Sequence, residues 1–167
     1  MVELFLNGRS LGKKKKAPFE YRLRWDDVVY EPGELKAIAY KNGAWWAEEV
    51  VKTTGGATQL RASADRIEIK ADGKDLSFIT VKTTDQDALT VPRSDNLIEF
   101  SIAGPGEIAG TDNGNPMDMV DFPSLSRNAF NGLALVIVRS KNGEGGVITV
   151  TAKSAGLREA KIQIRIK

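Results

Sequence analysis

The sequence is organised around residues 104–140, GPGEIAGTDNGNPMDMVDFPSLSRNAFNGLALVIVRS, which end in the strongest strand signal of the chain. Residues 133–138 form a run of six apolar residues, two of them Val and one Ile, between Gly132 and Arg139. A short, uninterrupted apolar run of this composition favours a β-strand that is covered on both faces. We therefore predict that this run is a central strand of a β-sheet.

Residues 111–131, which precede this strand, have no clean strand or helix periodicity. Loops of about twenty residues are uncommon in compact domains unless they are functional or disordered. This segment carries too many apolar side chains for disorder, so we predict an ordered loop that packs them onto the sheet. We also expect Arg127 to bind loop carbonyls or a loop aspartate. The apolar residues are Met117, Met119, Val120, Phe122, Leu125 and Phe130.

Short alternating segments separated by turn signals continue on both sides of this stretch, and none has the periodicity of an amphipathic helix. This pattern is typical of all-β sandwiches. In sequence order, we expect residues 133–139 and 146–153 to pair as a hairpin across KNGEG. The predicted strands are residues 2–6, 19–25, 35–40, 45–51, 59–64, 66–70, 76–83, 97–102, 133–139, 146–153 and 160–167.

Residues 53–57, TTGGA, have the composition of a linker between domains. We expect two immunoglobulin-like β-sandwiches in tandem, a partial one at residues 1–55 and a complete one at residues 57–167. The first has too few strands for a seven-stranded domain and begins almost inside a strand, so we expect it to be truncated. Alternation in FEYRLRW predicts that Phe19, Tyr21, Leu23 and Trp25 point inward from residues 19–25.

The composition removes several classes of chemistry. There is no Cys, which removes disulfides, thiolate metal sites and Cys nucleophiles. There is no His, which removes the commonest general base and a Ser-His-Asp site. The net charge of +2 gives little electrostatic support for nucleic-acid binding, and the four lysines at 13–16 suit a solvated hairpin arm. No apolar run approaches the roughly 18 residues of a membrane span. We expect no cofactor.

The most site-like cluster is DNGN at 112–115, with Asp118 and Asp121 nearby. Hard oxygen ligands at close spacing suit Ca²⁺, and Asp112, Asn113 and Asp118 are the candidates for a cation. An EF-hand pattern fails, because Met117 stands in place of Gly and Pro123 in place of Glu. The preferred interpretation is a series of Asx turns without metal, in which Gly114 takes a positive φ. Contact with a sugar is the third alternative.

Trp45 and Trp46 are the candidate carbohydrate contacts. Neighbours in a strand point to opposite faces, so we expect one of them to face the core and the other the solvent or another domain. An exposed Trp can stack on the apolar face of a pyranose. The alternative, which we prefer, is packing against a neighbouring domain, because exposed apolar patches mark protein interfaces.

Several strings of the sequence resemble the C-terminal accessory domains of bacterial β-galactosidases and related enzymes of glycoside hydrolase family 2. VELFLNGRSLG at 2–12 and YEPGELKAIAY at 30–40 resemble the domain that follows the catalytic barrel of that family. The remaining strings resemble the terminal immunoglobulin-like domain of these enzymes. They are ADGKDLSF at 71–78, GPG at 104–106, GTDNGNP at 110–116 and RNAFNG at 127–132.

The resemblance implies that the parent enzyme is a retaining glycosidase, and that its catalytic (β/α)₈ barrel with two glutamates lies elsewhere. No position here matches those glutamates, so no catalytic residue is assigned and the chain itself is expected to be inert. The implied role is structural support, with the barrel and other domains of the parent chain as partners. The alternatives are a carbohydrate-binding module that holds the enzyme on polysaccharide, or an adhesin-like surface domain. The resemblance implies a periplasmic or secreted bacterial parent, with neither nucleic acid nor membrane as a partner.

Overall fold

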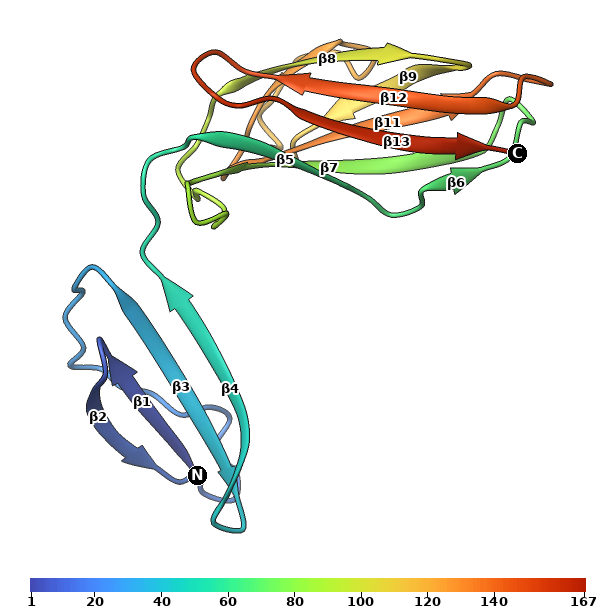
Figure 1. Ribbon diagram of the computed structural model, residues 1–167. Coiled ribbons are helices and arrows are strands. Elements are labelled where there is room, and N and C mark those ends of the chain that lie inside the picture. The colour runs from blue at the N-terminus through green and yellow to red at the C-terminus, as the bar shows by residue number, and fades with distance from the viewer. The chain divides into compact units, whose positions relative to one another are not determined.

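The computed structural model describes all residues from Met1 to Lys167 and contains thirteen β-strands and no helix (Figure 1). The predicted all-β class is therefore confirmed. The structure thus contains no helix that is long and apolar enough to cross a membrane. The chain forms two compact units, unit 1 at Met1–Thr53 and unit 2 at Thr54–Lys167. Each unit is described by itself.

Unit 1 is a single antiparallel sheet with the strand order β2-β1-β3-β4. Asn7 and Gly8 have φ values of 51° and 78°, and Asn42 and Gly43 have φ values of 52° and 83°. Two successive positive φ values define the type I′ turn that Asn-Gly favours, so Asn7-Gly8 closes the β1–β2 hairpin and Asn42-Gly43 the β3–β4 hairpin. The strands are β1 (Val2–Leu6), β2 (Arg9–Lys14), β3 (Glu34–Lys41) and β4 (Ala44–Lys52).

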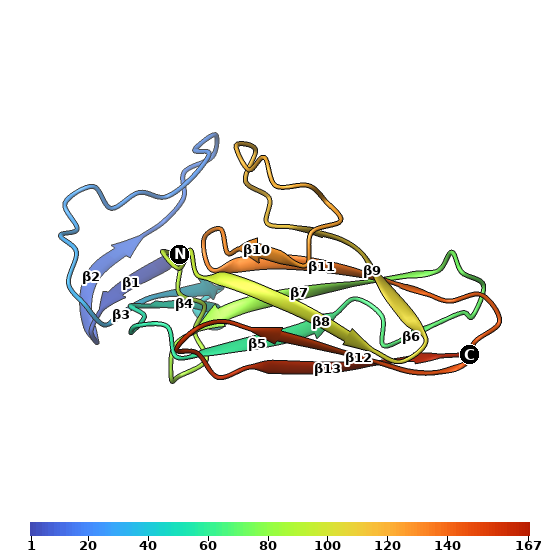
Figure 2. The same cartoon turned by 90° about the horizontal axis from the view of Figure 1, so that it is seen from above.

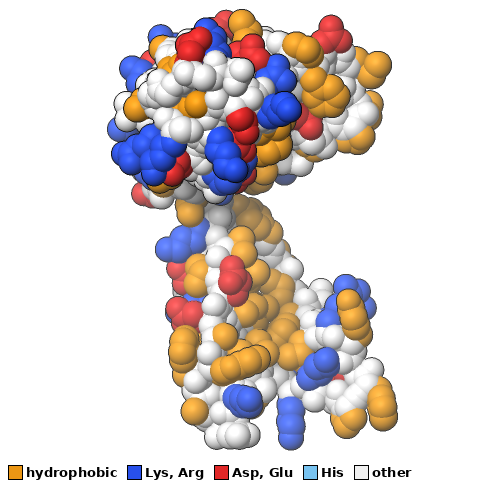
Figure 3. Space-filling view, turned by 90° about the vertical axis from the view of Figure 1, so that its right-hand side faces the viewer, with side chains coloured by type: hydrophobic (Ala, Val, Ile, Leu, Met, Phe, Trp, Pro, Cys, Tyr) orange, Lys and Arg blue, Asp and Glu red, His pale blue; other side chains and the backbone are white.

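Unit 1 buries little apolar surface, and Leu6 is its one fully buried hydrophobic residue. Hydrophobic side chains gather along its sheet in the lower part of Figure 3. The predicted strand at residues 19–25 is wrong, because this segment pairs with no strand. Phe19 and Tyr21 are exposed, while Leu23 and Trp25 are half-buried. Unit 1 covers Leu23 and Trp25 in part, but a single sheet offers no second layer that would bury Phe19 and Tyr21.

Unit 2 is a β-sandwich of two sheets, with strand orders β5-β7-β11-β9 and β10-β8-β12-β13-β6 (Figure 2). The first sheet and the β8-β12-β13 part of the second correspond to the four- and three-stranded sheets of the immunoglobulin fold. In addition, β6 pairs in parallel with β13, and β10 pairs with β8. The strands are β5 (Gln59–Ala64), β6 (Glu68–Ile69), β7 (Leu76–Thr84), β8 (Leu97–Ala103), β9 (Gly106–Asp112), β10 (Ser126–Asn128), β11 (Leu133–Ser140), β12 (Gly146–Lys153) and β13 (Ala160–Ile166).

The core of unit 2 lies between the two sheets and is built from alternate residues of the strands. Ala134, Val136 and Val138 of β11 are buried in it, so the central strand predicted here is confirmed. The prediction that β11 is covered on both faces holds for one face only. Leu133 is 38% exposed, and Leu135 and Ile137 on the outer face are only half-buried.

The predicted hairpin between residues 133–139 and 146–153 is wrong. Strand β11 pairs with β7 and β9, whereas β12 pairs with β8 and β13 in the other sheet. The Asn142-Gly143 turn is therefore part of a crossover between sheets. Stacked sheets lie about 10 Å apart, which five residues can span at about 3.3 Å each, so a short turn-like connection does not distinguish the two arrangements.

Candidate functional site

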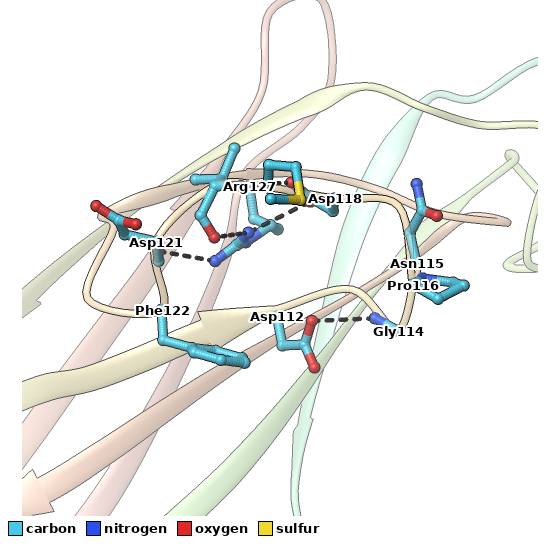
Figure 4. Close-up of a pocket in the computed structure, with 10 residues that line it drawn as sticks. Asp112, Gly114, Asn115, Pro116, Asp118, Asp121, Phe122 and Arg127 are labelled. Carbon is cyan, nitrogen blue, oxygen red and sulfur yellow. Dashed lines mark hydrogen bonds and ion pairs between the residues drawn. The ribbon is translucent and has the colours of Figure 1, made fainter.

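The β9–β10 loop, residues 113–125, surrounds a hollow of about 520 Å³ in unit 2 (Figure 4). Strand β9 ends at Asp112, immediately before the loop, and β10 begins at Ser126, immediately after it. The backbone N–H of Thr111 donates to the carbonyl of Phe122 at 2.7 Å, which closes the base of the loop. The hollow is lined by Asp112, Gly114, Asn115, Pro116, Asp118, Met119, Val120, Asp121, Phe122 and Arg127.

Arg127 of β10 holds the loop together from inside. Its side chain is 2% exposed and its guanidinium donates to the carbonyls of Thr111, Val120 and Asp121 at 2.7, 2.8 and 2.9 Å. It also forms an ion pair of 3.3 Å with Asp118. Arg127 is expected to bind loop carbonyls or a loop aspartate, and it binds both. Five fixed N–H donors make Arg suited to such convergent contacts.

Asp118 is the second fixed point of the loop. Its carboxylate accepts from the N–H of Val120 at 3.0 Å and from the side-chain amide of Asn113 at 2.7 Å. The N–H of Val120 and the Arg127 guanidinium hold the pKa of Asp118 below its usual value. The Asn113 amide also donates to the carbonyl of Asn128 at 3.0 Å, which ties the loop to β10.

The residues named as cation candidates are hydrogen-bonded to their own loop. Asp112 accepts from the N–H groups of Asn113 and Gly114 at 2.7 and 3.2 Å. Asn113 accepts from the N–H of Asn115, and Gly114 has a φ of 75°. These are the Asx turns that the sequence favours. No group of three acidic side chains converges in the structure in a way that could hold a metal ion.

The apolar side chains of the loop point into solvent. The prediction that the loop packs them onto the sheet is therefore wrong. The Arg127 contacts fix the backbone of the loop and leave its apolar side chains outward, where they gather at the upper right of Figure 3. The exposed fractions are 82% for Met117, 91% for Met119, 51% for Val120, 67% for Phe122 and 59% for Leu125; Phe130, which follows β10, is 38% exposed.

Trp45 and Trp46 on β4 are both 63% exposed, so the expectation that one of them faces a core is wrong. The pairing of β3 with β4 is irregular here, since Tyr40 lies opposite Trp45 but Ala39 lies opposite Ala47. Trp46 is the extra residue of a β-bulge, which disturbs the alternation of side chains. Because β4 is also an edge strand of a single sheet, no second layer covers either ring.

Sequence reasoning missed the role of Thr111 at this site. Thr111 is fully buried, and its carbonyl is the shortest contact of Arg127, while its hydroxyl donates to the carbonyl of Ser124 at 3.0 Å. The available signal was its place at the end of a strand, immediately before the turn residues. That place alone does not distinguish an anchor from an exposed threonine.

In comparison with known proteins, each of the two units matches a protein-family model. Residues 60–163 match the family described as glycoside hydrolase family 2 C-terminal domain 5. Residues 1–47 match a domain of unknown function, DUF4982.

Two curated relatives and one solved structure illustrate the similarity. Over 98% of its length the chain is 42% identical to the β-galactosidase BoGH2A of Bacteroides ovatus, and it covers 19% of that protein. It is 26% identical to a β-glucuronidase of Formosa agariphila, covering 98% of this chain and 17% of that protein. The crystal structure of a family 2 member from Bacteroides cellulosilyticus superposes with a TM-score of 0.91 at 41% identity, over 98% of this chain and 22% of that one. The chain thus spans about a fifth of the length of these relatives.

Proposed function

Because this chain belongs to glycoside hydrolase family 2, through its C-terminal domain 5, we propose that it is a non-catalytic supporting region of a larger glycosidase. The parent enzyme would act on β-galactosides, as the name of the relative from Bacteroides ovatus suggests. Retention of configuration would follow from the resemblance to the family. The chain would stabilise the catalytic barrel and shield part of its surface.

The observation that carries this proposal is the β9–β10 loop. Arg127 fixes its backbone, yet Met117, Met119 and Phe122 are exposed by 67–91%. Exposed apolar groups on an ordered loop are costly in solvent and are typical of protein–protein contact. The supporting role uses these side chains, since burying them against a neighbouring domain removes apolar surface from water.

The acidic side chains around the hollow support the non-catalytic part of the proposal. Retaining hydrolysis needs two carboxyl groups about 5 Å apart, one as nucleophile and one as acid and base. Here Asp118 is paired with Arg127, and Asp112 accepts backbone N–H groups of its own turn. Both carboxylates thus serve the structure of the loop.

The test compares the full-length polypeptide that contains this chain with a version lacking it. We expect the deletion to lower the thermal midpoint of the enzyme while kcat on a small aryl β-galactoside, per folded molecule, stays within about twofold. The isolated chain should hydrolyse no aryl glycoside. An unchanged thermal midpoint after the deletion would contradict the supporting role.

A carbohydrate-binding role is the second candidate, and the exposed Trp45 and Trp46 favour it. Exposed aromatic rings at two adjacent positions of a strand can stack on sugar rings. Titration of the chain with galactans, xylans and glucans, followed by tryptophan fluorescence, tests this role directly. Saturable binding that is lost in both Trp45→Ala and Trp46→Ala, combined with an activity loss on polymeric substrate only, would favour binding over support. The adhesin alternative has no observation of its own in its favour.

A further inference from the structure

We propose that the outer face of the β5-β7-β11-β9 sheet, together with the β9–β10 loop, is the surface on which another folded domain of the same longer polypeptide docks. We call this surface the docking face. The inference rests on the supporting role proposed above, and it adds which surface of unit 2 makes the contact and what its partner must present.

The two outer faces of the sandwich differ in chemistry. On the five-stranded sheet the outward positions pair polar residues, with Thr149 opposite Gln163 and Thr151 opposite Lys161. On the four-stranded sheet Ile137 lies opposite Phe78, which is 39% exposed. Antiparallel sheets with one solvated face alternate apolar and polar residues. On the five-stranded sheet the exposed apolar residues Leu97 and Val147 lie apart, near opposite ends of β8 and β12, whereas on the docking face Phe78 and Ile137 are direct neighbours.

The apolar run in β11 also indicates that the outer face of this sheet is suited to being covered. Its inward residues fill the core, but Leu133, Leu135 and Ile137 also occupy outward positions where a solvated strand would carry polar side chains. A continuous apolar run is typical of a strand that is buried on both faces. Nothing in unit 2 covers the second face, so the sequence is suited to a cover that comes from outside unit 2.

The β9–β10 loop continues this apolar surface. Gly110 lies opposite Ile137 and therefore on the outer face. A Cβ on Gly110 would lie 3.4 Å from the carbonyl oxygen and 3.8 Å from the Cβ of Phe122, so the backbone of Phe122 lies against the sheet where Gly110 leaves room, while its side chain is 67% exposed. Phe122 thus joins the outer face of β11 to the exposed methionines of the loop.

The backbone of the β9–β10 loop is also preorganised for binding. Arg127 and Asp118 hold its backbone through the contacts described above. Ordering a flexible loop on association lowers affinity, and a loop held in one conformation avoids that cost. The side chains at the tip, Met117 and Met119, are unbranched and adapt readily to an irregular partner surface.

Charges on opposite sides of the docking face define the polarity of the partner. Asp112 and Asp121, which line the hollow, are not ion-paired with Arg127, and both are acidic. On the side of β5 and β7, Arg61 and Lys82 lie opposite each other in register. The partner should therefore present an apolar patch with basic side chains facing the loop and acidic ones facing Arg61 and Lys82, an arrangement that fixes its orientation.

The occupant is assigned to the same polypeptide because the relatives are about five times longer than this chain. A domain tethered in the same polypeptide meets the docking face at a high effective concentration. A modest apolar surface is then sufficient for stable docking. A second copy of this chain and a polysaccharide are the competing occupants, and the experiment below separates them.

Methionine oxidation tests the docking face. Two of the three methionines of the chain, Met117 and Met119, lie on it. Peroxide converts exposed Met to the sulfoxide, and burial slows this reaction. We expect both residues to oxidise at least about tenfold more slowly in the full-length polypeptide than in the isolated chain, measured by peptide mass spectrometry against a reference peptide. Equal rates would overturn the proposal.

A pair of matched variants adds a second test. Phe78→Asp places a charge on the docking face, and Val147→Asp places one on the opposite outer face at a similar exposure, 39% against 45%. In the full-length polypeptide, Phe78→Asp should raise the oxidation rate of Met119 toward that of the isolated chain, and Val147→Asp should leave it unchanged. The thermal midpoint of the isolated chain identifies any variant that merely fails to fold. Equal effects of the two folded variants would contradict the assignment of this face.

The outcomes also separate this inference from the supporting role. Unprotected methionines in an enzyme that still loses stability on deletion of the chain would overturn the docking face and leave the supporting role intact. Protection that grows with the concentration of the isolated chain would assign the face to a second copy. Protection that requires added galactan, xylan or glucan would assign it to polysaccharide. Each of the last two results overturns the proposal.

Discussion

Replacement of Arg127 by Ala is the sharpest test of how the β9–β10 loop is held. The change removes the donor to three carbonyls and the ion-pair partner of Asp118. Water can reach the carbonyls of Val120 and Asp121, because both residues are exposed. Thr111 is fully buried, so its carbonyl loses a partner that water does not replace.

The expected cost of this change follows from those contacts. An unsatisfied buried acceptor costs about 1–3 kcal/mol, and the loss of a charged hydrogen bond to Asp118 adds about 1 kcal/mol. We therefore expect Arg127→Ala to lower the free energy of unfolding of unit 2 by about 3 kcal/mol. For a domain of this size, at roughly 4 °C per kcal/mol, the thermal midpoint should fall by about 12 °C.

The assay uses the distribution of chromophores. All three tryptophans, Trp25, Trp45 and Trp46, lie in unit 1, so their fluorescence reports on unit 1 and far-ultraviolet circular dichroism must be used for unit 2. Arg139→Ala is the matched control, since Arg139 is exposed and paired only with exposed Glu107 and should cost less than about 1 kcal/mol. A dichroism midpoint for Arg127→Ala equal to that of the control would refute the reasoning.

Two further predictions concern unit 2. Gly132 and Gly143 both have positive φ, but a Cβ on Gly132 would lie 2.3 Å from the carbonyl oxygen of Val91, whereas Gly143 has open space. In urea unfolding, Gly132→Ala should therefore lower the free energy of unfolding by at least about 2 kcal/mol more than Gly143→Ala, which adds only about 1 kcal/mol of backbone strain. Equal losses of unfolding free energy would contradict the steric argument. The N–H of Gly55, with those of Leu89 and Asp87, holds the pKa of buried Asp85 below its usual value. The stabilisation that Asp85 provides is therefore present above about pH 3.9 and is lost as the pH falls through the folded-state pKa. Asp85→Asn should reduce the dependence of the unfolding free energy on pH in the acid range. An unchanged dependence would exclude this role of Asp85.

Features that depend on neighbouring residues could be predicted from the sequence. Asn7-Gly8 and Asn42-Gly43 specify their turns within two residues, because few other pairs tolerate two positive φ values. The Asx turns at Asp112 and Asn113 are equally local. Alternation predicted most strands of unit 2 closely, since each of them has a core on one side.

Features that depend on distant partners could not be predicted. The alternation of residues 19–25 favours a strand, but a strand forms only where another strand offers its backbone groups. The bulge at Trp46 arises from the register between β3 and β4, which the adjacent tryptophans do not reveal. The apolar residues of the β9–β10 loop were interpreted as buried because apolarity indicates burial without showing what provides the cover.

The order of pairing in unit 2 has a consequence for how this domain forms. Strand β13 (Ala160–Ile166) lies between β12 and β6, and Gln59 at the start of β5 bridges to Arg158. The pairing of β13 with β6 and the bridge from Gln59 to Arg158 join residues that are about a hundred positions apart, and folding slows as such separations grow. During synthesis β5 can pair early with β7, but β6 must remain unpaired until β13 leaves the ribosome. The five-stranded sheet closes last, and that interval is when this domain is most exposed to misassociation.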